Sequence, residues 1–128
     1  MTPATMEWVQ KAEGDFTSAL REYRARKAPN YDSACFHAQQ CVEKYLKARL
    51  QEASTPFARI HDLSALLKLV IPIEPLWSIY DPGMKMLTDA AVELRYPGKW
   101  ATKTTAKSAV DFCRKFRKAA RGSFGLPA

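Results

Sequence analysis

Glycine, histidine and cysteine are scarce in this sequence, and their arrangement excludes several kinds of site. The 128 residues include five glycines, two histidines and three cysteines. No glycine-rich phosphate loop of the GxxxxGK[ST] or GxGxxG type occurs, and neither does a serine nucleophile elbow. The cysteines form no CxxC pair, and with only His37 and His61 as further ligands they do not favour a zinc site. We therefore predict no metal and no cofactor, and three buried thiols in a reducing compartment.

Long apolar runs are also missing, and this indicates whether the protein is expected in a membrane. No run approaches the roughly 18 apolar residues that a membrane-spanning helix needs. The first residues lack the basic start and the apolar stretch of a secretory signal. Hydrophobic residues make up 47% of the chain, enough for a sizeable core. We expect a cytoplasmic protein that does not enter a membrane.

Strand-like alternation of apolar and polar residues is absent, whereas apolar residues recur at helical spacing. The sequence predicts an all-α protein, an up-and-down four-helix-type bundle with an extra short helix. It forms one domain over residues 1–128, with a core at about 5–121. The expected helices run from a cap at Thr5 to about 26, from a cap at Asp32 or Ser33 to about 53, from a cap at Asp62 to about 70, from about 82 to 94, and from Thr104 or Thr105 to about 121. Residues 71–82 hold three prolines and are expected to be irregular.

The pattern that organises the chain lies at residues 33–50, which contain no glycine or proline. Around a helix, one broad arc is apolar and consists of Ala34, Ala38, Cys41, Val42, Tyr45, Leu46, Ala48 and Leu50. The opposite arc is polar and consists of His37, Gln40, Glu43, Lys44 and Lys47. An apolar arc this wide contacts several neighbours, so we predict a central helix. Gln39 falls on the apolar side, and we expect its amide to bind a neighbouring backbone, since an unpaired buried amide costs about 1–3 kcal/mol.

Acidic residues are few near the C-terminal end, where positive charge gathers. The formal net charge is +7, and residues 103–121 contain seven lysines and arginines against one acid, Asp111. Such a surface attracts phosphates, acidic proteins or lipid headgroups. It also suits a solvated helix end, because cations are favoured near a helix C-terminus.

Two features together form the best candidate for a binding site. Lys44 and Lys47 lie on one helix face, and Arg95 stands at a helix end before a stiff turn. A guanidinium in that position is well placed to receive a phosphate or a carboxylate, and Tyr96 and Trp100 are suited to stack on a base. Alternatively, Arg95 forms a salt bridge with an acid of another helix, and the two aromatic side chains pack under the loop.

The two histidines have simpler interpretations beside catalytic ones. His61, just before the cap at Asp62, is either a turn residue with local hydrogen bonds or a group that lines a pocket. His37 belongs to the polar arc and is expected to face solvent. A self-contained enzyme is therefore the weaker interpretation.

Four segments of the sequence, taken in order, resemble those of one protein family. They are Trp8, Ala12, Asp15 and Ala19; the pattern A-x-F-x-x-Q-Q-x-x-E-K-x-L-K-A at residues 34–48; His61-Asp62-Leu63 with Leu66-Leu67; and Arg95-Tyr96-Pro97. The set resembles the HEPN domain, the higher-eukaryote and prokaryote nucleotide-binding domain, over about residues 7–120. The resemblance implies a helical bundle, usually a homodimer, with a minimal nucleotidyltransferase as frequent partner in two-gene modules of toxin–antitoxin type.

The resemblance also bears on catalysis. Some HEPN proteins are metal-independent RNases that use an Arg-x4–6-His motif near the last helix. Arg95 occupies the place of that arginine, but no histidine follows it. The general acid–base group for attack by a 2′-hydroxyl is thus missing from its usual place.

We therefore predict a non-catalytic HEPN-type module that binds a nucleotide, a partner nucleotidyltransferase, or both. The residues assigned to this binding are Lys44, Lys47, Arg95 and Tyr96. One alternative is a HEPN-type ribonuclease toxin with non-standard catalytic residues. Another is nonspecific binding of RNA or DNA through the basic C-terminal helix.

Overall fold

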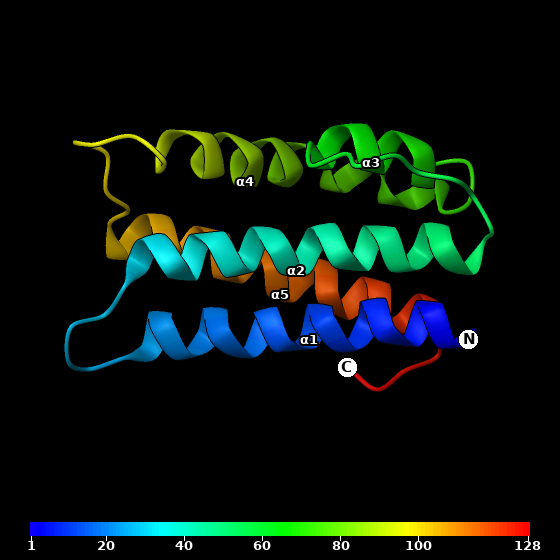
Figure 1. The fold of residues 1–128 in the computed structure, drawn as a ribbon, viewed down its shortest axis with the longest axis horizontal. Helices are drawn as coiled ribbons and strands as arrows, with labels where there is room; N and C mark the ends of the chain where they lie inside the picture. Colours follow the sequence, from blue (N-terminus) through cyan, green and yellow to red (C-terminus); the bar gives the residue numbers. More distant parts are fainter.

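The computed structural model describes all 128 residues and consists of helices joined by turns (Figure 1). The helices are α1 (Pro3–Arg24), α2 (Tyr31–Glu52), α3 (Leu63–Val70), the 3-10 helix η1 (Pro75–Tyr80), α4 (Asp81–Glu93) and α5 (Lys103–Ser123). No strand is present, so the predicted all-α bundle of four principal helices and a shorter one is confirmed. None of the helices combines the length and the apolar character needed to cross a bilayer.

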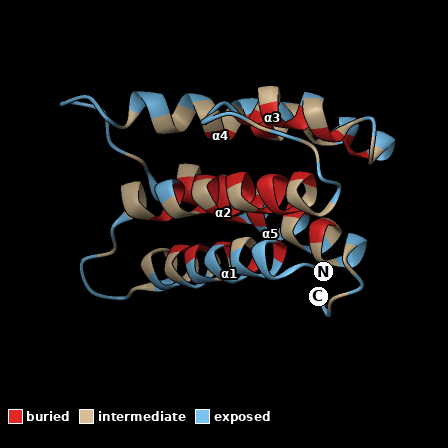
Figure 2. Ribbon diagram, turned by 45° about the vertical axis from the view of Figure 1, so that its right-hand side comes forward, coloured by how far each residue is buried: buried red, intermediate tan, exposed pale blue.

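Helix α2 lies at the centre of the bundle, as its wide apolar arc predicts. It packs against α1 along one side, against α5 behind, and against α3 and α4 on the other side (Figure 1). All eight side chains of the predicted apolar arc are fully buried. Buried residues accordingly follow α2 through most of its length (Figure 2). A helix covered on three sides has little surface left for solvent, which explains why polar residues on it also become buried.

The helix starts differ from the predicted ones by a few residues. Helix α1 is capped by Thr2, where Thr5 was predicted, and α2 is capped by Asn30, where Asp32 or Ser33 was predicted. Helix α5 is capped by Thr102, where Thr104 or Thr105 was predicted. In each case several residues able to cap follow one another, and the first with an extended backbone is used. The predicted cap at Asp62 is confirmed, because its carboxylate accepts a hydrogen bond from the amide of Ala65.

The proline-containing segment after α3 is more regular than predicted. Pro75 opens η1, where its fixed φ and missing N–H suit the first turn of a helix. The 3-10 helix places Trp77 in the core, with its ring edge-on to Phe116 at a centroid distance of 5.1 Å. This contact fastens the α3–α4 connection onto α5.

Polar pairs also join the long helices. Glu13 of α1 accepts hydrogen bonds from Arg117 of α5 at 2.7 and 2.6 Å and from the Tyr45 hydroxyl of α2 at 2.6 Å. Burial pushes the pKa of Glu13 up, but these donors and their charge outweigh it, and the pKa ends below its ordinary value. Three helices thus meet at one carboxylate.

Candidate functional site

A cleft of about 910 Å³ opens between α2 and the C-terminal part of α4. The first half of α2 supplies one wall, with Phe36, Gln39, Gln40 and Glu43 among its residues. The other walls come from the end of α4, the turn before α3 and the loop before α5. The volume falls in the range of sites for small molecules and cofactors.

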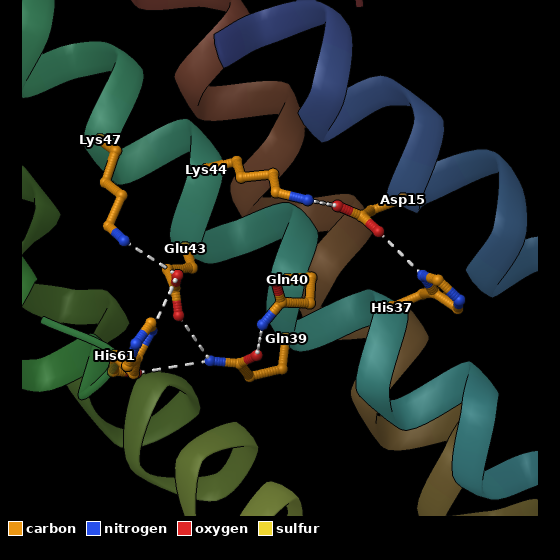
Figure 3. A network of polar contacts seen from close by, with 8 residues as sticks. All are labelled: Asp15, His37, Gln39, Gln40, Glu43, Lys44, Lys47 and His61. Carbon is orange, nitrogen blue, oxygen red and sulfur yellow. Dashed lines mark hydrogen bonds and ion pairs between the residues drawn. The ribbon is translucent and has the colours of Figure 1, made fainter. Parts of the chain in front are cut away.

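A buried polar network forms the floor of the cleft (Figure 3). The Gln39 amide donates to the Glu43 carboxylate at 3.2 Å and to the backbone carbonyl of His61 at 3.4 Å. Gln40 donates to the Gln39 carbonyl oxygen at 2.8 Å. The prediction that Gln39 ties α2 to a neighbouring backbone is therefore confirmed. The network fixes the turn before α3 against α2.

The carboxylate of Glu43 is the centre of this network. It is 4% exposed and accepts a hydrogen bond from Lys47, whose Nζ lies 3.0 Å from Oε2. The His61 imidazole approaches the same oxygen at 3.4 Å through Nδ1. The polar arc is not a solvated face at Glu43 and Lys47, because the two charges compensate each other and the neighbouring segments cover them. Helical periodicity places a residue on a face but does not reveal a partner that covers that face.

His61 combines the two roles predicted as alternatives. The cap at Asp62 starts α3 and leaves His61 in the preceding turn, where its backbone carbonyl is held by Gln39. Its side chain is 73% exposed and lines the cleft. An imidazole with one nitrogen toward a carboxylate and an exposed ring is suited to exchange protons with a bound molecule.

Arg95 lies at the mouth of the cleft, directly after the end of α4. It is exposed and makes no ion pair or side-chain hydrogen bond, so the alternative of a salt bridge to another helix is wrong. Trp100, on the loop that leads to α5, also lines the cleft and is 79% exposed. Tyr96 is 63% exposed beside Arg95 and does not line the cleft. Neither aromatic side chain packs under the loop.

A hydrogen bond ties the Trp100 loop to the start of α2. The carboxylate of Asp32, in the first turn of α2, accepts from the backbone amide of Ala101 at 2.7 Å. This contact joins the start of α2 to the start of α5 next to the cleft. Asp32 appeared in the sequence only as a possible helix cap, and the missed signal is its spacing from Phe36, Gln39 and Glu43 along one face of α2.

The two lysines assigned to the site do not line the cleft. Their side chains point instead toward Asp15 and Glu43 (Figure 3). Lys44 pairs with Asp15 of α1, and the same carboxylate accepts from His37 at 2.8 Å. His37 is thus held by an acid and its side chain is 28% exposed, so the prediction that it faces solvent is only partly confirmed. Lys47 is buried with Glu43, and its Nζ lies 5.7 Å from the centre of the Trp8 ring. The structure therefore does not bring Lys44 or Lys47 together with Arg95.

The cysteines do not supply a nucleophile. All three are free and buried. Burial, together with the charge of Asp32, raises the pKa of Cys35 to about 11. Burial also raises the pKa of Cys41, which faces Cys113. No group of three or more His, Cys, Asp or Glu side chains is placed to hold a metal ion.

A second, smaller hollow of about 540 Å³ lies on α5, away from the cleft. It is lined by Arg114, Lys115, Arg117 and Lys118, with Asp111 at its edge. Arg117 is engaged with Glu13, whereas the other three cations are exposed and form no ion pair. This surface concentrates positive charge but has no buried polar group to select a ligand.

A helical bundle with a polar cleft and one unpaired arginine at its mouth defines a small module that binds a ligand or a partner. The family model of the HEPN domain matches residues 5–123, and the chain belongs to this family of helical modules of nucleotide-binding or RNase type. Comparison with curated proteins and with solved structures gave no match.

Proposed function

We propose that the protein is a non-catalytic HEPN module that binds a nucleotide in the cleft between α2 and α4. The observation that carries the proposal is Arg95, a guanidinium at the cleft mouth with no acidic partner. An unpaired arginine receives a phosphate through two parallel hydrogen bonds. Trp100 offers a flat, exposed surface on which a base stacks.

The other assigned residues take different parts in this proposal. Tyr96 extends the exposed aromatic surface beside Arg95. Lys47 acts indirectly, by holding the Glu43 carboxylate in the cleft floor. Lys44, held by Asp15 on the α1 side, belongs to a surface for a partner protein rather than to the cleft.

A protein partner is part of the same proposal, either a second copy of the chain or a minimal nucleotidyltransferase in a two-gene module of toxin–antitoxin type. Exposed apolar side chains at the cleft support it, namely Phe36, Val92 and Trp100, which are 53%, 48% and 79% exposed. Apolar groups gathered at one place on a small domain mark a contact surface. Sedimentation of the purified chain, alone and with the nucleotidyltransferase, tests both partners.

Thermal unfolding in the presence of common nucleotides tests the cleft. A ligand at about 100 times its Kd stabilises the folded state by about 2.7 kcal/mol, which raises the Tm by several degrees. We expect this shift in the wild type and its loss in Arg95→Ala. The matched control is Arg114→Ala, which removes an exposed arginine of α5 and should keep the shift. A wild type that no nucleotide stabilises would refute nucleotide binding.

A ribonuclease with non-standard residues is the second candidate, because His61 and Arg95 line the same cleft. His61 would take the proton of a 2′-hydroxyl, whose oxygen attacks the phosphorus while Arg95 stabilises the added negative charge. The 5′-oxygen leaves with a proton from the imidazolium, and a 2′,3′-cyclic phosphate forms. Incubation of RNA with the wild type, Arg95→Ala and His61→Ala tests this, and uncleaved RNA in all three would reject it.

Nonspecific binding of RNA or DNA through α5 is supported by the three unpaired cations of the second hollow. Such binding weakens by about one log unit per log unit of salt for each phosphate contact. Triple replacement of Arg114, Lys115 and Lys118 by alanine should remove most of that salt dependence. Affinity that does not change with salt would exclude this mode.

A further inference from the structure

We propose that the cleft selects a nucleotide that carries one phosphate group, and discriminates against the corresponding triphosphate. The inference rests on the proposed nucleotide binding and adds the class of nucleotide. It follows from the charges that line the cleft and from the partners that those charges already have.

The charged side chains of the cleft are three acids and one permanent cation. The acids are Asp32, Glu43 and Asp62, and the cation is Arg95. Lys47, which does not line the cleft, compensates the charge of Glu43 through an ion pair. The other two acids accept only neutral backbone amides, at 2.7 Å for Asp32 and 3.1 Å for Asp62, so that their charges remain.

At the two helix N-termini beside the cleft, a side-chain cap already holds one of the free amides that could bind a further phosphate. A free helix N-terminus binds phosphate through its unpaired amides. At α3, however, the Asp62 carboxylate holds the amide of Ala65, and at α2 the Asn30 side chain holds that of Ser33. A second or third phosphate would therefore find no permanent cation in the cleft beyond Arg95, and it would meet two carboxylates.

Size does not explain the selection, because the cleft is large. Its volume of about 910 Å³ lies near the upper end of the range for small-molecule sites. A triphosphate would fit, so its exclusion depends on charge. Like charges placed against the wrong ligand are a common source of specificity.

Calorimetric titration of the wild type with adenosine, AMP, ADP and ATP, repeated with the guanine and cytosine series, measures this selection. For the base that binds, we expect the monophosphate to bind about tenfold more tightly than both the nucleoside and the triphosphate, a difference of about 1.4 kcal/mol. Each titration is run with and without Mg²⁺, which neutralises part of a triphosphate's charge.

Two variants separate the attraction of the phosphate to Arg95 from its repulsion by Asp32 and Asp62. Arg95→Ala should remove the preference for the monophosphate over the nucleoside. The double variant Asp32→Asn/Asp62→Asn should bind the triphosphate at least as well as the monophosphate. Asparagine keeps the acceptor oxygen that holds Ala101 and caps α3, and circular dichroism verifies the fold. Asp111→Asn, an exposed acid of α5, is the matched control and should leave the preference unchanged.

The outcomes distinguish this inference from the proposal on which it rests. A wild type that binds the triphosphate more tightly than the monophosphate, with or without Mg²⁺, overturns the inference and leaves nucleotide binding in place. A double variant that keeps the wild-type preference also overturns it. If no nucleoside or nucleotide binds, both the inference and the proposed function are wrong.

Discussion

Replacing Lys47 by methionine should destabilise the fold strongly, because it leaves the Glu43 carboxylate buried without its cation. The two side chains are 8% and 5% exposed, and the nitrogen and oxygen are 3.0 Å apart. Removing one partner of a buried pair costs about 3–5 kcal/mol. Glu43 keeps the Gln39 amide at 3.2 Å, so we expect about 3 kcal/mol, the lower end. Methionine fills much of the lysine's volume, which limits the contribution from lost packing.

Urea unfolding at neutral pH measures this cost. With a slope of about 1–3 kcal/mol per molar urea, the midpoint should fall by roughly 1–3 M. The double variant Glu43→Gln/Lys47→Met removes both charges and should recover most of the loss, since replacing a buried pair by neutral groups is often close to neutral. Lys115→Met, at an exposed and unpaired lysine of α5, is the control and should change stability little.

Two results would refute this reasoning. An unchanged midpoint for Lys47→Met would show that Glu43 does not depend on its cation. A double variant no more stable than Lys47→Met alone would show that the loss does not come from an unpaired charge on Glu43. Either result would also contradict the role that we propose for Lys47, which is to hold the Glu43 carboxylate in the cleft.

Three further predictions concern the rest of the bundle. Hydrogen bonds and charges outweigh burial and lower the pKa of Glu13 below 4.5, so Glu13→Gln should cost about 1–2 kcal/mol of unfolding free energy at pH 7. In urea unfolding, the stability difference between wild type and variant should vanish as the pH falls through the lowered pKa of Glu13. An unfolding free energy that differs between wild type and variant by the same amount in acid as at pH 7 would contradict this. Gly83→Ala would place a methyl 2.1 Å from the Phe112 ring, so the Tm should fall by a few degrees, whereas Gly122→Ala, with nothing nearby, should not lower it. Cys35, with a pKa of about 11, should resist iodoacetamide at about pH 7 in the folded protein and react after unfolding, as mass spectrometry would report.

The arrangement of the helices could be predicted well from the sequence, because it depends on which residues are apolar. The wide arc of α2 requires neighbours on several sides, and the structure supplies them. The helix starts were less predictable. Thr2 and Thr5 are both suitable caps, and the choice depends on a backbone that only tertiary contacts fix. Thr5 is buried instead, where its hydroxyl donates to Glu52 at the far end of α2.

The candidate site was predictable only where a residue needs no partner. Arg95 stands at a helix end, and its exposure follows from the turn that comes after it. Lys47 was assigned to the same site by its position on the polar arc, but Glu43 and Trp8 cover it. Glu43 lies one turn away on the same helix, but Trp8 belongs to α1, and periodicity within α2 does not contain the information that α1 covers this pair. The hydrogen bond from Ala101 to Asp32 is of the same kind.

The position of α4 has a consequence for how the cleft opens. Helices α1, α2 and α5 share a core, whereas α4 contacts that core mainly through α2 and only slightly through α5. A hydrogen bond that the Leu63 amide donates to the Thr88 hydroxyl, at 3.4 Å, joins it to α3. Elements held by few contacts open at a lower free energy than the whole fold. Amide hydrogens of α4 should therefore exchange with solvent well before those of α2, and under the proposed nucleotide binding the wall that carries Arg95 would be the one to move.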